Sequence, residues 1–110
     1  MSIIDTEFPF TLPVGYHDAD GTLHKNGVMR LATAGDEILP LKDPRVQANP
    51  AYLTVIVLSR VIVRLGTLDM INTKVIEDLY SKDYIFLQAL YNRINSGDEG
   101  GTGGSVPPGK

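Results

Sequence analysis

Apolar and polar residues alternate along the first part of the chain. Between residues 8 and 16 every second position is apolar, and these positions hold Phe8, Phe10, Leu12, Val14 and Tyr16. A period of two that uses aromatic and branched residues is typical of a half-buried β-strand. Prolines occupy positions 9 and 13, in the opposite register. Because proline has no N–H to donate to a neighbouring strand, we expect this strand to lie at the edge of a sheet.

A turn signal separates this strand from a second one. Residues 17–22 (HDADGT) combine aspartates, whose side chains bind the local backbone, with a glycine, which adopts positive φ readily. Residues 23–33 follow, with Leu23, Met29 and Leu31 on one face, and are predicted as the second strand. We therefore expect residues 8–33 to form a β-hairpin.

Residues 34–50 form a polar connection that is interrupted by prolines. Asp36 and Glu37 are expected to open a short helical turn here, because negative charge is favourable at a helix N-terminus. The pair Asn49-Pro50 at the end of the connection is a helix start signal, with asparagine as the N-cap and proline as the first helical residue.

The most apolar stretch of the chain is residues 51–66, AYLTVIVLSRVIVRLG. Its many β-branched residues favour a strand. Its length, its start signal and Gly66 as a C-terminal cap favour a helix. We predict a helix over about residues 50–65. Arg60 and Arg64 would then share one face near its C-terminal end, where cations interact favourably with the helix dipole.

Two further helices complete the predicted fold. Residues 74–80 follow Asn72 and Thr73, either of which can cap a helix, and residues 82–95 follow Ser81, another candidate cap. Residues 97–110 are rich in glycine and proline and are predicted to be a flexible tail. We expect an α+β fold in which the hairpin packs on a three-helix unit. Residues 8–96 form its single domain, and residues 1–7 are a flexible N-terminus.

The composition of the chain narrows its range of functions. Its 110 residues carry a formal net charge of −3, which argues against a nucleic-acid partner, since proteins that bind nucleic acids have basic surfaces. The chain contains no cysteine, so disulfides, thiolate metal sites and cysteine nucleophiles are excluded. Residues 51–65 are too short for a bilayer and include two arginines, so we expect no membrane span.

The hairpin turn carries the first candidate chemistry. His17 and His24 flank it and would form a metal site if Asp18 or Asp20 supplied a further ligand, although surface histidines are far commoner than such sites. The turn also begins like a calcium loop, yet position 12 of that loop would be Met29 instead of the required glutamate. A metal-dependent enzyme or sensor is thus the weaker alternative, and we predict neither a metal nor a cofactor.

Catalytic patterns have no support elsewhere in the sequence. Asp36 and Glu37 are adjacent carboxylates, but this position is more typical of a helix start than of an acid–base pair. No serine, histidine and aspartate grouping can be assembled from the spacing, and no glycine-rich loop follows a predicted strand. We therefore expect that the protein is not an enzyme.

The apolar excess of residues 51–65 is the stronger functional signal. A helix that is apolar nearly all round is buried on most sides, and the hairpin and two helices would cover only part of it. The remainder would be an exposed patch of the kind that marks interaction sites. The arginines either dock an acidic partner or are solvated and paired to Glu77 or Asp78. The predicted partner-binding residues are Leu53, Val57, Arg60, Arg64, Tyr84 and Tyr91.

Four phrases, in this order, resemble a known family. They are GYHDADG at residues 15–21, MRLATAGDE at 29–37, VIVRLG at 61–66, and IEDL followed by DYIFLQALYNRIN within 76–95. Their order and wording resemble the small tail assembly chaperones of contractile-tailed phages, chiefly the Mu-type family, and related proteins of phage-tail-like contractile injection systems. The resemblance covers about residues 12–95.

The resemblance implies a non-enzymatic function. Such chaperones bind the long, apolar, helix-rich tape-measure protein and keep it soluble in the bacterial cytoplasm until tube subunits polymerise around it. The implied partners are the tape-measure protein or other tail components, with self-association as a further option. The alternative is a small structural subunit of the same particle, such as a tail, baseplate or cap adaptor, which would remain associated with the particle.

Overall fold

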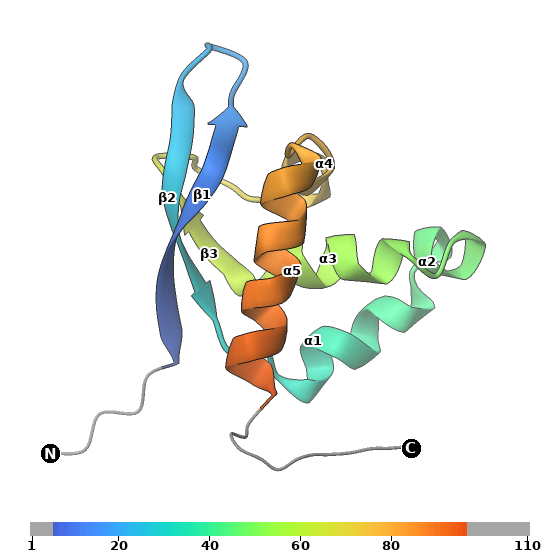
Figure 1. Cartoon of the computed structure of the whole chain (residues 1–110). Coiled ribbons are helices and arrows are strands. Elements are labelled where there is room, and N and C mark those ends of the chain that lie inside the picture. Colours follow the sequence, from blue (N-terminus) through green and yellow to red (C-terminus); the bar gives the residue numbers. More distant parts are fainter. Residues whose placement is uncertain (1–5, 97–110) are drawn as a thin grey trace, which may run out of the picture.

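The computed structural model describes residues 6–96, which form an antiparallel sheet with helices on one of its sides (Figure 1). The α+β class is therefore confirmed. In chain order the elements are β1 (Glu7–His17), β2 (Leu23–Arg30), α1 (Ala34–Ile38), the 3₁₀ helix η1 (Leu39–Lys42), α2 (Pro44–Ala48), α3 (Tyr52–Val61), β3 (Ile62–Leu65), α4 (Thr73–Glu77) and α5 (Ser81–Asn95).

The predicted hairpin is confirmed, although its second strand ends at Arg30 and does not extend to residue 33. Strands β1 and β2 pair antiparallel from Glu7 opposite Arg30 to His17 opposite Leu23. The strand order β1-β2-β3 places β1 at an edge, as its prolines predicted. Glu7 already belongs to the strand, so the prediction of a flexible segment over residues 1–7 is wrong at its end. Residues 1–5 and the predicted tail at residues 97–110 lie outside the described residues.

The alternation along β1 is broken by a bulge. The pairing register shifts between Thr11 and Tyr16, where Gly15 has a φ of 110°. This left-handed backbone conformation favours glycine, and a Cβ here would also displace the exposed side chain of Leu23, whose Cδ1 would lie 2.6 Å away. Within this irregular stretch Val14 is 38% exposed, whereas the alternation predicted that it faces the core.

The predicted helix over residues 50–65 is wrong in its last turn. Helix α3 ends at Val61, and Ile62–Leu65 is a third strand that pairs antiparallel with β2. The β-branched residues favour this conformation, and the open edge of β2 supplies the hydrogen-bonding partner. Gly66 has a positive φ of 57°, but it follows a strand, and its N–H donates to the Asn26 carbonyl at 2.7 Å.

The connection between the hairpin and α3 is more helical than predicted. The expected turn at Asp36 and Glu37 is α1, but η1 and α2 were not predicted, so the described residues contain five α-helices instead of three. Asp43 caps α2 by accepting from the Arg45 N–H. Helix α3 begins at Tyr52, after the predicted start at Asn49-Pro50.

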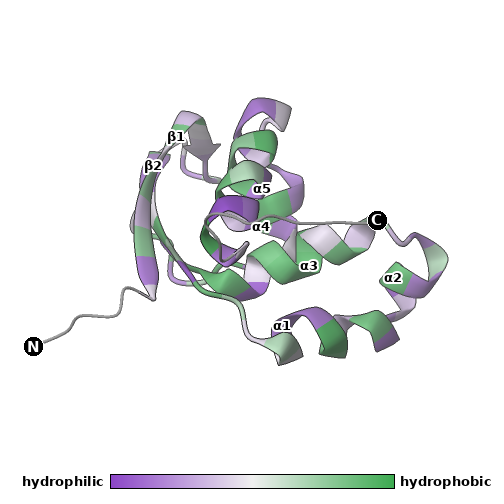
Figure 2. Cartoon of the chain, turned by 60° about the horizontal axis from the view of Figure 1, so that its bottom comes forward, coloured by the Kyte–Doolittle hydropathy of each residue, from purple (hydrophilic) through white to green (hydrophobic). Residues whose placement is uncertain are grey.

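The last two helices follow the prediction closely. Asn72 caps α4 through the Val75 N–H at 3.0 Å, as expected, although α4 ends at Glu77. Tyr80 is the N-cap residue of α5, so the proposed cap at Ser81 is wrong. Figure 2 shows apolar residues along α3, and the core lies between the sheet and the helices. Its buried members are Phe10, Leu12, Met29, Leu58, Val61, Ile62, Leu65, Val75, Ile76, Leu79, Leu87 and Leu90.

Within residues 6–96, no helix has both the length and the apolar character that crossing a membrane requires.

Candidate functional site

A pocket of about 230 Å³ lies where helices α1, α3 and α5 meet. It is lined by Glu37, Leu53, Thr54, Val57, Leu58, Gln88, Tyr91 and Asn92. Helical spacing explains why these side chains meet. On α3 the lining residues recur four positions apart, and on α5 they lie three and four apart, so each set shares one helix face. The two helices thus contribute complementary walls to one pocket.

The walls of the pocket differ in character. Helix α3 supplies most of its apolar surface, through Leu53, Val57 and Leu58. Helix α5 supplies the amides of Gln88 and Asn92. The pocket is therefore half apolar and half lined by groups that form hydrogen bonds, which is the combination that recognises an amphipathic side chain or peptide.

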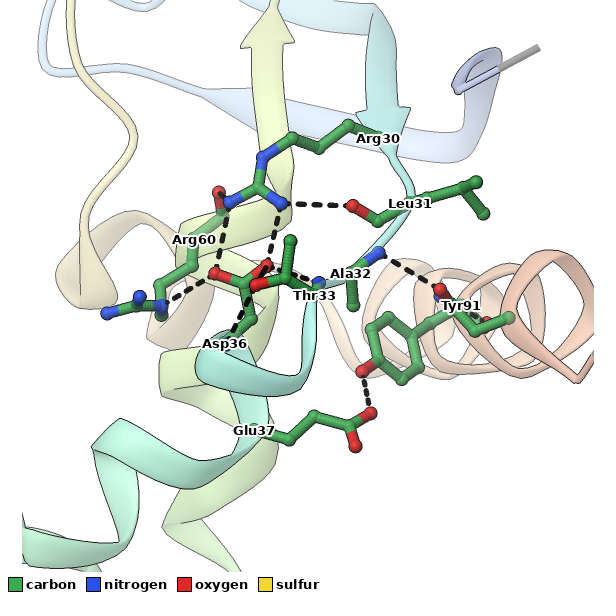
Figure 3. Close-up of polar contacts among 9 residues, drawn as sticks. Arg30, Leu31, Ala32, Thr33, Asp36, Glu37, Arg60 and Tyr91 are labelled. Carbon is green, nitrogen blue, oxygen red and sulfur yellow. Dashed lines mark hydrogen bonds and ion pairs between the residues drawn. The ribbon is translucent and has the colours of Figure 1, made fainter. Parts of the chain in front are cut away.

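Glu37 and Tyr91 join two walls of the pocket. The Tyr91 hydroxyl donates a hydrogen bond to Oε2 of Glu37, which reaches across from α1 (Figure 3). Burial raises the pKa of Tyr91 above its usual value, and the neighbouring Glu37 carboxylate raises it further. The hydroxyl therefore stays protonated at physiological pH and remains a donor to the carboxylate.

The carboxylate next to Glu37 in the sequence has a different role. Asp36 is 2% exposed, and its Oδ2 and Oδ1 accept from the two terminal nitrogens of Arg30 at 2.7 and 3.1 Å. Oδ1 also accepts from Nε of Arg60 at 2.9 Å. The hydrogen bonds from Arg30 are the main reason that the pKa of Asp36 is far below its usual value. Asp36 is thus an ionised structural centre shared by β2, α1 and α3 (Figure 3).

Local hydrogen bonds complete this junction. Thr33 is the N-cap of α1, and its side chain and that of Asp36 bind each other's backbone N–H groups as a capping box. The Ala32 N–H donates to Oδ1 of Asn95 at the end of α5, at 3.0 Å. Helix α1 is therefore fixed to the sheet, to α3 and to α5, and this junction holds Glu37 at the pocket.

The structure brings together three of the six predicted partner-binding residues. Leu53, Val57 and Tyr91 line the pocket, although Val57 is only 6% exposed. Tyr84 belongs to α5 and is half-buried. This burial raises the pKa of its hydroxyl above the usual value. Three residues of the predicted set thus line one pocket, and their role in partner binding stays a prediction.

The two arginines of the predicted set are separated. Arg60 belongs to α3 and Arg64 to β3, so the prediction that they share one helix face is wrong. Arg60 pairs with Asp36, and neither Glu77 nor Asp78 forms an ion pair with it. The interruption of the helix after Val61 is the physical reason, because it redirects the chain between the two arginines.

Asp83 is a second buried carboxylate, and the sequence pattern did not predict its role. Asp83 at the start of α5 is fully buried, and its two oxygens accept from the N–H groups of Val14 and Gly15, each at 2.8 Å. It satisfies the backbone that the β1 bulge leaves unpaired. The capping box around Asp36 involves residues that are close in the sequence. Asp83, in contrast, accepts hydrogen bonds from Val14 and Gly15, which precede it by 69 and 68 positions.

The histidines do not form a shared site. His24 is 3% exposed; its Nε2 lies 2.8 Å from Asp18, and its Nδ1 accepts from the Thr67 N–H at 3.3 Å. His17 is exposed and lies opposite Leu23, one step along the ladder from the pair of Tyr16 and His24. Over residues 6–96 there is no cluster of three or more His, Asp or Glu side chains that could hold a metal ion.

The hairpin turn is organised by Asp18. Its Oδ1 accepts from the N–H groups of Asp20 and Thr22, both at 2.9 Å, and the hydrogen bond from His24 is the main cause of its lowered pKa. These bonds make an aspartate-stabilised turn, which is the interpretation that the sequence favoured over a calcium loop.

An exposed apolar segment continues from the pocket along the chain. Ile38, Leu39 and Leu41 directly follow Glu37 and are 58%, 53% and 46% exposed. They belong to α1 and η1, and both elements contact α3. Three large apolar side chains within four residues are an unusual concentration for a surface.

We call the pocket residues together with Ile38, Leu39 and Leu41 the helical face.

No protein-family model, curated protein or solved structure matches this chain.

Proposed function

We propose that this protein is a non-enzymatic assembly chaperone that binds an apolar helical segment of its partner on the helical face. The observation that carries the proposal is that the exposed residues Ile38, Leu39 and Leu41 directly follow Glu37, which lines the half-apolar pocket. A partner helix would bury the three side chains and place one of its own residues in the pocket. Burial of apolar surface is the main driving force of such helix-in-groove binding.

The resemblance of residues 12–95 to phage tail assembly chaperones supports a particular partner. We assign the partner as the tape-measure protein of a contractile phage tail or of a phage-tail-like injection particle. A long apolar helical protein needs its surface covered before the tube assembles, because exposed apolar helices associate with one another. A small acidic protein with an exposed apolar segment suits that task.

This function places the protein in the cytoplasm of the bacterial cell that assembles the particle. It also implies a transient complex, since the polymerising tube subunits have to displace the chaperone. A structural tail, baseplate or cap subunit would instead stay bound in fixed stoichiometry.

Mass spectrometry of purified particles tests this distinction. The chaperone function predicts that the protein is present in the lysate during assembly and absent from finished particles. A constant copy number per particle would contradict the chaperone function and favour a structural subunit. The lysate sample serves as the control that the protein is expressed.

A further inference from the structure

We infer that the pocket of the helical face accepts a lysine side chain from the partner helix. This inference deepens the proposed function and rests on it for the partner to which the lysine belongs.

The pocket contains a carboxylate that the fold leaves open. Glu37 is exposed, and among residues 6–96 its Oε2 accepts from Tyr91 while its Oε1 has no donor. Its neighbour Asp36 is the opposite case, since two arginines and Thr33 occupy its oxygens. No ion pair in the described part of the chain involves Glu37. A cation is the complementary charge for this site.

The other lining residues suit an ammonium group on an apolar stem. Thr54, Gln88 and Asn92 each carry a side-chain oxygen that can accept a hydrogen bond, and an ammonium has three donors. Leu53 and Val57 supply apolar surface for the methylene groups of the stem.

The state of Glu37 favours lysine over arginine. A guanidinium binds a carboxylate best through two parallel hydrogen bonds, which use both oxygens. Tyr91 already donates to Oε2, so a guanidinium that used both oxygens of Glu37 would have to share Oε2 with this hydroxyl. A compact ammonium can use Oε1 alone and take its further acceptors from neutral neighbours.

The size of the pocket favours a single side chain. Its volume of about 230 Å³ is below the roughly 300 Å³ at which typical small-molecule pockets begin. One lysine side chain fits this space.

The side chain alone can serve as the probe. n-Butylammonium chloride reproduces the stem and charge of lysine, and n-butanol reproduces the stem without the charge. Titration of the ¹⁵N-labelled full chain with each compound, followed by amide chemical shifts at constant ionic strength, locates the binding. We expect n-butylammonium to shift the signals of Thr54, Gln88 and Asn92 at millimolar concentration. We expect n-butanol to bind at least threefold more weakly.

Two matched variants separate the charge of Glu37 from general effects. Glu37→Gln removes the carboxylate of the pocket, and Glu77→Gln removes the carboxylate of a second tyrosine–glutamate pair, which accepts from Tyr52 outside the pocket. We expect at least threefold weaker n-butylammonium binding in Glu37→Gln and unchanged binding in Glu77→Gln. Equal binding of both compounds, equal effects of both variants, or shifts confined to other residues would overturn the inference.

The outcomes also separate this inference from the proposed function. If n-butylammonium binds as expected but the protein is a fixed component of particles, the lysine pocket stands and the chaperone function falls. If a tape-measure complex forms but is insensitive to Glu37→Gln, the chaperone function stands and the lysine pocket is wrong.

Discussion

Oδ1 of Asp36 lies 2.9 Å from Nε of Arg60, although 24 positions separate the two residues in the sequence. This contact ties the start of α1 to the last turn of α3, and Arg30 of β2 binds the same carboxylate. The helical face is therefore assembled around a buried ionic centre, and its position depends on that centre as well as on apolar packing.

The first prediction concerns this centre. Asp36→Asn should lower the free energy of unfolding by about 2–3 kcal/mol, because it leaves Arg30 and Arg60 without their charge partner. The arginines are partly exposed, so the cost is below that of a fully buried pair. Urea unfolding measures the difference. Asp43→Asn is the matched control, since Asp43 pairs with Arg45 at the surface and should cost below about 1 kcal/mol. Similar costs for the two variants would contradict the structural role of Asp36.

The second prediction is a dependence of stability on pH. The pKa of Asp36 is lowered in the folded protein, chiefly by the hydrogen bonds from Arg30. The ionised Asp36 therefore contributes fully to the free energy of unfolding when the pH is above the pKa of an aspartate in the unfolded chain, about 4. This contribution is lost as the pH falls toward the lower pKa that Asp36 has in the folded protein. Urea unfolding at pH 5, 4 and 3 should show a falling free energy of unfolding. The fall should be shallower in Asp36→Asn, and parallel curves for the two proteins would show that Asp36 does not carry the effect.

A third prediction concerns the bulge of β1. Asp83→Ala should lower stability by about 2–4 kcal/mol, because two N–H groups, those of Val14 and Gly15, lose their acceptors. Thermal unfolding measures the loss, and faster amide exchange at Val14 and Gly15 locates it. Lys82→Ala changes the exposed neighbouring residue and should leave both readouts nearly unchanged. Unchanged exchange at the bulge in Asp83→Ala would refute the assignment.

The fourth prediction separates the two arginines. Arg60→Glu should destabilise the fold, because it places a second carboxylate beside Asp36. Arg64→Glu should change stability by less than about 0.5 kcal/mol, since Arg64 is exposed on β3. Circular dichroism during thermal unfolding compares them. If both variants unfold like the wild type, Arg60 has no structural role.

Local patterns predicted those parts of the fold that depend on neighbouring residues. The alternation of Phe8, Phe10 and Leu12 predicted β1, and its prolines predicted the edge. Leu53, Val57 and Tyr91 were predicted to bind a partner, and all three line the pocket, although their binding stays a prediction.

The features that the sequence did not reveal depend on distant partners. Ile62–Leu65 is a strand because β2 offers an edge to pair with, and the local preferences for helix and strand in this segment nearly cancel. Asp83 is buried because a bulge 68 residues earlier needs acceptors. Glu37 was interpreted only as part of a helix start, and its place in the pocket follows from the Asp36 junction that fixes α1.

The exposed apolar segment offers the most direct test of partner binding. We expect the full chain, co-expressed with the proposed partner, a tape-measure protein of a contractile phage tail, to keep that protein soluble and to co-purify with it. Leu39→Asp with Leu41→Asp should weaken the complex at least about tenfold, since it removes apolar surface from the interface. The control is Met70→Asp, which changes a 69% exposed apolar residue outside the helical face and should leave the complex intact. A complex equally strong with both variants, or no gain in soluble tape-measure protein, would contradict the account.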